Sequence, residues 1–257
     1  MRIVSLVPSL THLIVDLGLR DALVGCTNFC IEPPGLQRTA TLCGGTKDPN
    51  IDQIANLKPT HVLVNEEENK PEHIAALGAF TNVLNTFPKS PEDVPAMIRD
   101  ICSFLGVQDD HNYAGQIDTL IEEIKTLATG VPLKTFMYFI WRNPWMIVSE
   151  DTYISRMLTL LGYRNVCQTE NRYPEVSFPL QGEIPETIFF STEPFPFRRR
   201  DIVSLKDEWP SHPPVLKADG MLCSWYGSML IKALKEAKKY CRGESQQLFV
   251  SMDVPES

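Results

Sequence analysis

Apolar and polar positions in the first 106 residues repeat one arrangement along the chain. Short apolar runs typical of buried strands, such as Ile3 to Val7 and His61 to Val64, are followed by stretches with apolar residues at steps of three and four, which are typical of helices. Glycine, proline and asparagine punctuate these segments. Strands that alternate with helices in this way predict an α/β fold with a mostly parallel sheet.

The longest helical pattern runs from Asp109 to Thr129. Its apolar residues form one stripe, which must pack against other elements. Asp109 or Asp110 can cap its start, and Gly130 can end it in a left-handed conformation. At about 1.5 Å per residue the helix would span roughly 30 Å. We interpret it as a rigid helix that joins two lobes.

The strand-and-helix pattern restarts after this helix with the apolar run Lys134 to Ile140, and it ends in a helical stretch from Tyr226 to Arg242. A proline- and charge-rich connection is expected over residues 195–214. The predicted organisation is an N-terminal α/β lobe over residues 1–106, a linking helix over 107–131 and a C-terminal α/β lobe over 132–257.

Composition excludes two classes of protein. A net charge of -8 and a pI near 5.2 argue against nucleic acid as a partner, because binding to phosphates rewards basic surfaces. The sequence holds no apolar run near the ~18 residues of a membrane span, so we expect a protein that does not span a membrane. No leader precedes the first strand, which as written predicts a cytoplasmic protein; removal of a leader would make it periplasmic.

The seven cysteines include no Cys-x-x-Cys pair, which favours reduced thiols over a disulfide framework. Cys26, Cys30 and Cys43 could hold a metal ion or could be core thiols. No metal site and no covalently bound cofactor are expected.

Aromatic and charged residues gather where predicted strands end, which is where parallel α/β sheets bind ligands. Aromatic rings offer flat apolar contact, and Arg or Lys can hold carboxylates or phosphates, so the set suits a bulky ligand with several functional groups. Arg142 is the expected clamp, and Trp145 is expected to be exposed and to face the ligand. The candidate ligand-binding residues are Lys47, Glu66, Glu67, Asn69, Trp141, Arg142, Trp145, Trp225 and Tyr226.

Several segments together resemble the helical-backbone solute-binding proteins, the class III periplasmic family that serves ABC importers of cobalamin and ferric siderophores. They are Arg2 to Thr11 (RIVSLVPSLT), Leu23-Val24-Gly25, Pro33-Pro34, Gly44-Gly45, Leu57-Lys58-Pro59 and the central helix. The resemblance implies two α/β lobes bridged by one helix, with a ligand cleft between the lobes.

The same resemblance implies a non-catalytic protein that binds a chelated metal or corrinoid, such as cobalamin, a ferric siderophore or a haem-like ligand. It also implies an ABC permease as partner, and Glu72, Asp207 and Glu208 are the nearest counterparts of the family's docking residues. A cytosolic enzyme or cofactor-handling protein that uses the same cleft is the alternative, since the acidic loop Glu66 to Glu68 could include an acid/base pair.

Overall fold

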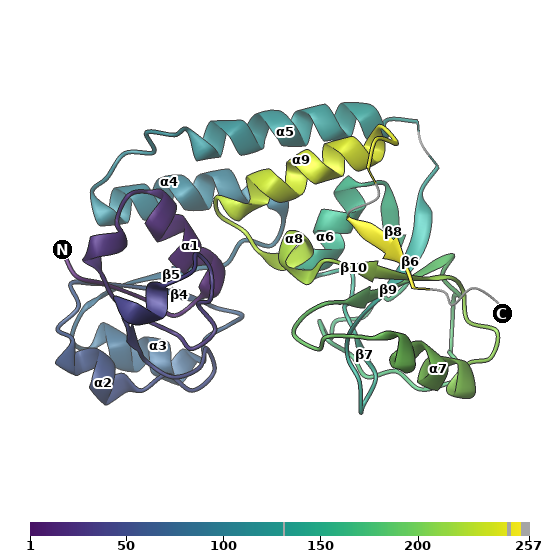
Figure 1. Ribbon diagram of the computed structural model, residues 1–257, viewed down its shortest axis with the longest axis horizontal. Coiled ribbons are helices and arrows are strands. Elements are labelled where there is room, and N and C mark those ends of the chain that lie inside the picture. The colour runs from purple at the N-terminus through teal and green to yellow at the C-terminus, as the bar shows by residue number, and fades with distance from the viewer. Residues whose placement is uncertain (131, 246–247, 253–257) are drawn as a thin grey trace. The chain divides into compact units, whose positions relative to one another are not determined.

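The computed structural model describes residues 1–130, 132–245 and 248–252 (Figure 1). The chain divides into two compact units. The first comprises residues 1–88, 93–117 and 226–231, and the second comprises 89–92, 118–225 and 232–257. The predicted lobe boundaries stay a prediction, and residue 131 and residues 246–247 and 253–257 of the predicted segments lie outside the described residues.

The first unit contains, among its described residues, a five-stranded sheet in the order β3-β2-β1-β4-β5, in which every neighbouring pair is parallel. Its strands are β1 (Ile3–Ser5), β2 (Leu23–Cys26), β3 (Thr41–Leu42), β4 (His61–Asn65) and β5 (Asn82–Thr86). Its helices are α1 (Pro8–Asp16), α2 (Ile51–Asn56), α3 (Pro71–Gly78) and α4 (Val94–Leu105). The strand order reverses between β1 and β4, and α/β sheets bind ligands beyond the carboxyl ends of strands at such a point.

The core of the first unit follows the alternation of side chains along its strands. One face of the sheet packs against α2 and α3 through aliphatic residues and one cysteine, namely Val4, Leu6, Cys43, Ile54, Val62, Val64 and Leu77. Helices α1 and α4 lie on the other side of the sheet (Figure 1). Seven residues of α4 are buried, as its sequence period predicts.

The second unit contains a mixed sheet in the order β11-β10-β9-β6-β7, with β8 also paired to β6. The pairs β10–β9, β9–β6 and β6–β8 are parallel, whereas β7 and β11 are antiparallel to their neighbours. The strands are β6 (Lys134–Trp141), β7 (Met146–Ile147), β8 (Tyr163–Asn165), β9 (Thr187–Ser191), β10 (Val215–Ala218) and β11 (Phe249–Ser251). The helices are α6 (Tyr153–Leu160), α7 (Arg199–Glu208) and α8 (Gly220–Ser224). The predicted α/β class with mostly parallel sheets is confirmed.

Helix α7 lies where the sequence predicted only a connection. Asp201 caps it, because its Oδ2 accepts a hydrogen bond from the Arg198 amide at 2.7 Å. Ile202 and Leu205 are buried at a spacing of one helical turn. The three arginines at residues 198–200 hid this short pattern, because they give its first turn the composition of a solvated loop.

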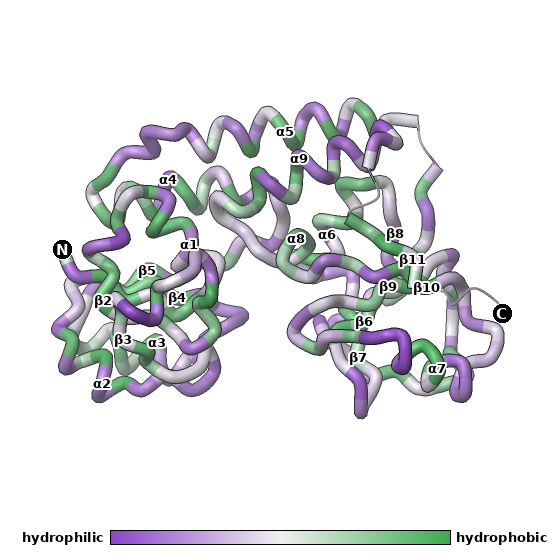
Figure 2. Tube along the Cα trace, in the orientation of Figure 1, coloured by the Kyte–Doolittle hydropathy of each residue, from purple (hydrophilic) through white to green (hydrophobic). Residues whose placement is uncertain are grey.

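Helix α5 (Tyr113–Ala128) is the long central helix, and it begins later than the pattern predicted. The Asp109 carboxylate caps it by accepting hydrogen bonds from the amides of Tyr113 and Ala114, both at 2.9 Å. Gly130 has a φ of +79°, the predicted left-handed stop. Apolar and polar residues alternate along α5 and along α9 (Met229–Cys241) (Figure 2). The division between the units falls after Ile117, and the predicted role of α5 as a rigid joint stays a prediction.

Within the described part of the chain, no helix is both long and apolar enough to cross a membrane.

Candidate functional site

Asn69 holds together the loops that follow β1, β3 and β4 in the first unit. Its Nδ2 donates to the carbonyl oxygens of Thr46 at 2.8 Å and Leu6 at 3.4 Å, and its Oδ1 accepts from the Asn65 amide at 2.9 Å. The side chain is only 1% exposed. The Asn69 amide is therefore engaged in shaping the loops, and its predicted contact with a ligand stays a prediction.

Lys47, Glu66 and Glu67 meet at this edge of the sheet, as the strand-end argument predicts. Lys47 is exposed, and its Nζ donates to the backbone carbonyl of Glu67. The Asn65 side chain fixes the acidic loop by accepting from the amides of Glu67 at 2.8 Å and Glu68 at 3.2 Å. Glu66 is exposed at the start of this loop. The edge thus presents one ammonium group beside carboxylates.

The side chain of Glu68 is partly buried within the acidic loop. Burial raises the pKa of its carboxyl group, and the neighbouring Glu67 adds to the rise, while Lys47 and a hydrogen bond with Thr46 oppose it. The hydrogen bond with Thr46 holds the carboxyl group against the loop that carries Lys47. The arrangement supports a loop shaped by burial and gives no evidence for an acid/base pair.

Phe29 and Ile31 are two exposed apolar residues that the sequence analysis left out of the candidate site. They follow β2, and their side chains are 59% and 58% exposed. Exposed large apolar side chains at a strand's carboxyl end point to a partner or a ligand. The signal was present in the sequence, since the loop after a predicted strand carried an aromatic and an aliphatic residue close together.

Trp141 ends β6 in the second unit and remains open to solvent, with 39% of its side chain exposed. Its ring contacts Phe195 edge-on, with centroids 5.5 Å apart. Phe195 lies in the segment that follows β9. The Trp141 ring is therefore partly exposed to solvent and partly packed against Phe195. Such an arrangement is compatible with its predicted place on a ligand-contacting surface.

Arg142 is engaged inside the second unit. One terminal nitrogen donates to Asp201 Oδ1 and the other to Ser204 Oγ, both at 2.7 Å. Both partners belong to α7, and the Asp201 side chain is only 1% exposed. Both terminal nitrogens thus hold α7 to the end of β6 in this structure, and the clamp role of Arg142 stays a prediction.

Trp145 is a core residue, so the prediction of an exposed, ligand-facing indole is wrong. Its side chain is 5% exposed and stacks on Phe197 and Phe190, with centroids 6.2 Å and 6.1 Å away. Its Nε1 donates to Glu208 Oε1 at 3.0 Å. The physical reason is the hairpin formed by β6 and β7. Because Trp141 pairs with Met146, the turn between the two strands places the side chain of Trp145 over the sheet.

Trp225 and Tyr226 follow helix α8, where the sequence predicted that they follow a strand. The side chain of each is 8% exposed. The division between the two units falls between these residues. A place for them in the ligand site is untested and remains a prediction.

The predicted docking residues lie in terminal turns of two helices. Glu72 is exposed in the first turn of α3, and Asp207 and Glu208 are exposed at the end of α7. Glu208 also accepts the hydrogen bond from Trp145. Their role in docking stays a prediction.

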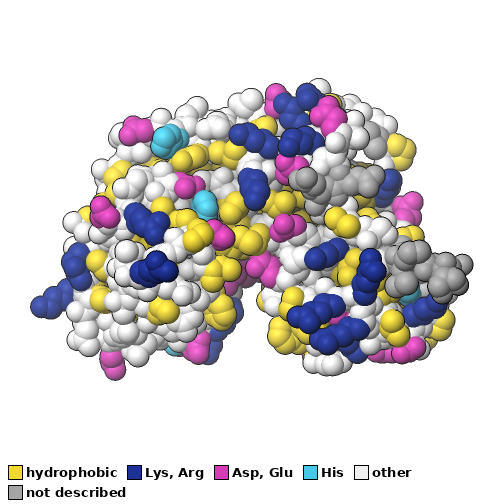
Figure 3. Space-filling model, viewed as in Figure 1, with side chains coloured by type: hydrophobic (Ala, Val, Ile, Leu, Met, Phe, Trp, Pro, Cys, Tyr) yellow, Lys and Arg dark blue, Asp and Glu magenta, His cyan; other side chains and the backbone are white. Residues whose placement is uncertain are grey.

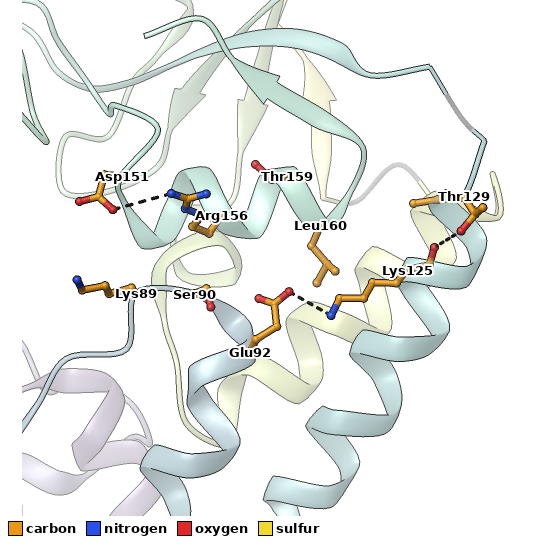
Figure 4. Close-up of a pocket in the computed structure, with 10 residues that line it drawn as sticks. Lys89, Ser90, Glu92, Lys125, Thr129, Asp151, Arg156, Thr159 and Leu160 are labelled. Atoms are coloured by element: carbon orange, nitrogen blue, oxygen red, sulfur yellow. Dashed lines mark hydrogen bonds and ion pairs between the residues drawn. The ribbon is translucent and has the colours of Figure 1, made fainter. Parts of the chain in front are cut away.

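A pocket of about 610 Å³ lies in the second unit (Figure 4). Charged side chains around it pair with one another: Lys125 with Glu92 at 3.4 Å, and Arg156 with Asp151 at 4.0 Å. None of the sequence-predicted ligand residues lines it. Its lining residues are Lys89, Ser90, Glu92, Lys125, Ala128, Thr129, Asp151, Arg156, Thr159 and Leu160. No aromatic side chain is among these lining residues, so the pocket lacks the flat apolar contact expected for the ligand.

Two further observations bear on alternative sites. Among residues 1–130, 132–245 and 248–252, no group of three or more His, Cys, Asp or Glu side chains could hold a metal ion, which counts against a metal at Cys26, Cys30 and Cys43. Acidic side chains stand among basic ones on the face shown in Figure 3.

Comparisons with known proteins agree on one family and one fold. The family described as periplasmic binding protein matches residues 3–188. The vitamin B12-binding protein of Photorhabdus laumondii subsp. laumondii is 24% identical over 242 residues, which cover 87% of this chain and 86% of that protein.

Two solved structures share the fold along nearly all of their length. The periplasmic vitamin B12-binding protein BtuF of Vibrio cholerae has a TM-score of 0.76 at 19% identity, with 96% of this chain and 98% of that chain covered. A periplasmic haem-binding protein from Pseudomonas aeruginosa has a TM-score of 0.76 at 18% identity, with 100% and 99% covered.

Proposed function

Because the chain belongs to the family of periplasmic binding proteins, we propose that it binds a corrinoid or a haem-like iron chelate and delivers it to an ABC permease. Family membership confirms the resemblance drawn from the sequence motifs. It also means that the protein binds its ligand without transforming it, so the alternative of a cytosolic enzyme is not favoured. We place the protein in the periplasm, the compartment for which the family is named.

The observation that carries the choice of ligand is the pair of exposed aromatic side chains at strand ends. Phe29 in the first unit is 59% exposed, and Trp141 in the second is 39% exposed. A corrin or porphyrin ring has large, flat, apolar faces, which stack well on such side chains. The names of the relatives supply the same ligand class, since one binds vitamin B12 and another binds haem.

We propose a ligand surface in each unit. In the first unit it comprises Phe29, Ile31, Lys47, Glu66 and Glu67, which combine apolar contact with polar groups for the edge of a ring. In the second unit it centres on Trp141. Exposed aromatic anchors contribute strongly to binding when a ligand buries them. The predicted cleft between the lobes remains a prediction.

The test is a titration with cyanocobalamin and with haemin, followed by tryptophan fluorescence and thermal unfolding. A ligand at about 100 times its Kd should stabilise the folded chain by ~2.7 kcal/mol. Recovery of the ligand unchanged after release distinguishes binding from turnover. If cobalamin, haemin and a panel of ferric siderophores all leave the melting temperature unmoved, the proposed ligand class is wrong.

Variants locate the surface. Phe29→Ala and Trp141→Ala should each weaken binding by about 1–2 kcal/mol, or roughly tenfold, because each removes an aromatic contact. Phe80→Ala is the matched control, since Phe80 is also exposed, at 42%, but lies just beyond the end of α3 and not at the carboxyl end of a strand. Equal losses in all three variants would show that the strand ends are not the binding surface.

A further inference from the structure

Three cysteines of the first unit are buried close to one another at the ends of β2 and β3. Cys26 is the last residue of β2, Cys30 lies in the turn that follows, and Cys43 follows β3. All three are 0% exposed. Their thiols do not form a metal site, so their proximity needs another account.

Cys43 faces away from the other two thiols. A Cβ placed on Gly25 would meet Cys43 Sγ at 2.9 Å, so the Cys43 side chain lies on the face of the sheet toward which Gly25 points. Successive residues of a strand point to opposite faces. Cys26 therefore points to the other face, and Cys43 packs instead with the aliphatic cluster under α2 and α3.

Cys30 lies on the same side as Cys26. A turn brings it back, since the Cys30 amide donates to the Thr27 carbonyl at 3.1 Å. The Cys26 and Cys30 thiols lie within hydrogen-bonding reach of each other. The Thr11 hydroxyl, from α1, lies 3.1 Å from Cys30 Sγ, and the Thr27 hydroxyl lies 3.2 Å from it.

These contacts make the two thiols unequal. Hydrogen bonds from Cys26, Thr11 and Thr27 lower the pKa of Cys30, against the effect of burial. The same thiol–thiol contact and burial raise the pKa of Cys26. A thiolate is the nucleophile in disulfide exchange, and an adjacent thiol can resolve the intermediate. Cys30 is thus suited to attack first and Cys26 to complete the bond.

We propose that Cys26 and Cys30 are a disulfide-forming pair that closes when the chain folds in the presence of a disulfide oxidant. The Cys30 thiolate attacks one sulfur of the oxidant, forms a mixed disulfide and releases one oxidant thiolate, which takes up a proton. Cys26 then loses its proton and attacks Cys30 Sγ, which releases the second oxidant thiol. Two cysteine thiols are oxidised, and one oxidant disulfide is reduced to two thiols.

The bond would stiffen the turn that carries Phe29. Residues 27–29 lie between the two cysteines, so closing the pair limits the conformations of that segment. Since both sulfurs are buried in the folded chain, the oxidant reaches them before burial is complete, once the local turn from Thr27 to Cys30 has brought the two thiols together, and the bond is then shielded from reductants. An oxidising compartment supplies the necessary conditions.

The experiment refolds the full, reduced and denatured chain in buffer that contains oxidised and reduced glutathione. Free thiols are then alkylated under denaturing conditions, and the chain is digested with trypsin. Cys26 and Cys30 fall in one tryptic peptide, residues 21–38, whereas Cys43 falls in the next, residues 39–47. The expected result is an unalkylated 21–38 peptide, lighter by two hydrogen atoms than its reduced form.

Other outcomes overturn the proposal. A cross-link between the 21–38 and 39–47 peptides would show that Cys43 is the partner, and an alkylated or glutathione-modified 21–38 peptide would show that no internal bond forms. Cys43→Ser is the matched control and should leave the bond intact, whereas Cys30→Ser should abolish it. The assay uses no ligand, so its failure would leave the proposed function standing, and failure of the ligand titration would leave the disulfide standing.

Discussion

The two units build the cores beneath their sheets from different side chains. In the first unit the cluster under α2 and α3 is mainly aliphatic. In the second unit the corresponding cluster is rich in aromatic rings: Phe139, Trp145, Phe190, Phe197 and Trp209, with Phe178 and Phe195 packed against it. The first sheet is covered there by two helices, whereas α7 and irregular segments cover the second. Wide rings fill the uneven space that loops leave.

This difference changes what an aromatic residue after a strand means. In the first unit the cluster under α2 and α3 is mainly aliphatic, and the aromatic side chain of Phe29 is exposed outside it. In the second unit Trp141 and Trp145 lie in one hairpin, yet the first is 39% exposed and the second 5%. The comparison shows that an aromatic residue near a strand end can be exposed or part of the core, and that the packing beneath it decides which.

The largest expected effect separates these two tryptophans. Trp145→Ala should lower the free energy of unfolding by about 3–5 kcal/mol, because it leaves a cavity beside the stacked rings of Phe190 and Phe197. Trp141→Ala should lower it by less than about 1 kcal/mol, because half-exposed side chains lose little burial. Urea unfolding measures both. A small loss for Trp145→Ala would show that the aromatic cluster is not a packed core.

A second prediction tests whether Arg142 is a structural residue. Arg142→Ala should lower the free energy of unfolding by about 2–4 kcal/mol, because it leaves the buried Asp201 carboxylate without its guanidinium partner. Arg164→Ala is the matched control: Arg164 pairs with Glu183 at the surface, and its loss should leave stability nearly unchanged. Loss of ligand affinity with unchanged stability would instead show that Arg142 contacts the ligand.

A third prediction probes the aliphatic core of the first unit. Ile54→Val should lower the free energy of unfolding by about 0.5–1.5 kcal/mol, since it removes one methylene from a fully buried position on α2. Urea unfolding is again the measurement. A loss as large as that of Trp145→Ala would erase the contrast between the two cores.

The smallest effect concerns Glu68 and pH. Its folded-state pKa is raised, first by burial, so the folded chain holds its proton more tightly than the unfolded chain does. Stability should therefore fall as the pH rises from the ordinary glutamate pKa through the raised one. Glu68→Gln should be more stable than the parent at neutral pH, with the difference vanishing in acid. Melting temperatures measured against pH test this, with the exposed Glu66→Gln as control; a constant difference at all pH values would contradict it.

Much of the fold could be predicted because its signals are local. Alternating strands and helices, the cap at Asp109 and the stop at Gly130 each depend on residues within a turn or two of one another. Helix α7 was missed because its signal is short and opens with three arginines. The helix predicted from Tyr226 begins at Met229, since Trp225 and Tyr226 lie in the link after α8.

The candidate site was less predictable, because it depends on which strand-end side chains remain uncovered. Lys47, Glu66, Glu67 and Trp141 lie at the predicted edges. Asn69, Arg142 and Trp145 lie there too, but each is engaged by other parts of its unit. The residue types identified the strand ends at which a ligand surface could form. Contacts with distant segments decided which side chains remain exposed there.

The sequence alone was enough to predict most of the succession of strands and helices and the family, because periodicity and motifs are properties of neighbouring residues. The occupied fork of Arg142 and the burial of Trp145 became evident only from the packing of the folded chain. The partner that holds Arg142 is Asp201, which lies 59 residues farther along the chain. No local pattern encodes such a pairing; it arises when separate segments pack together and compete with solvent and ligand for the same polar and aromatic groups.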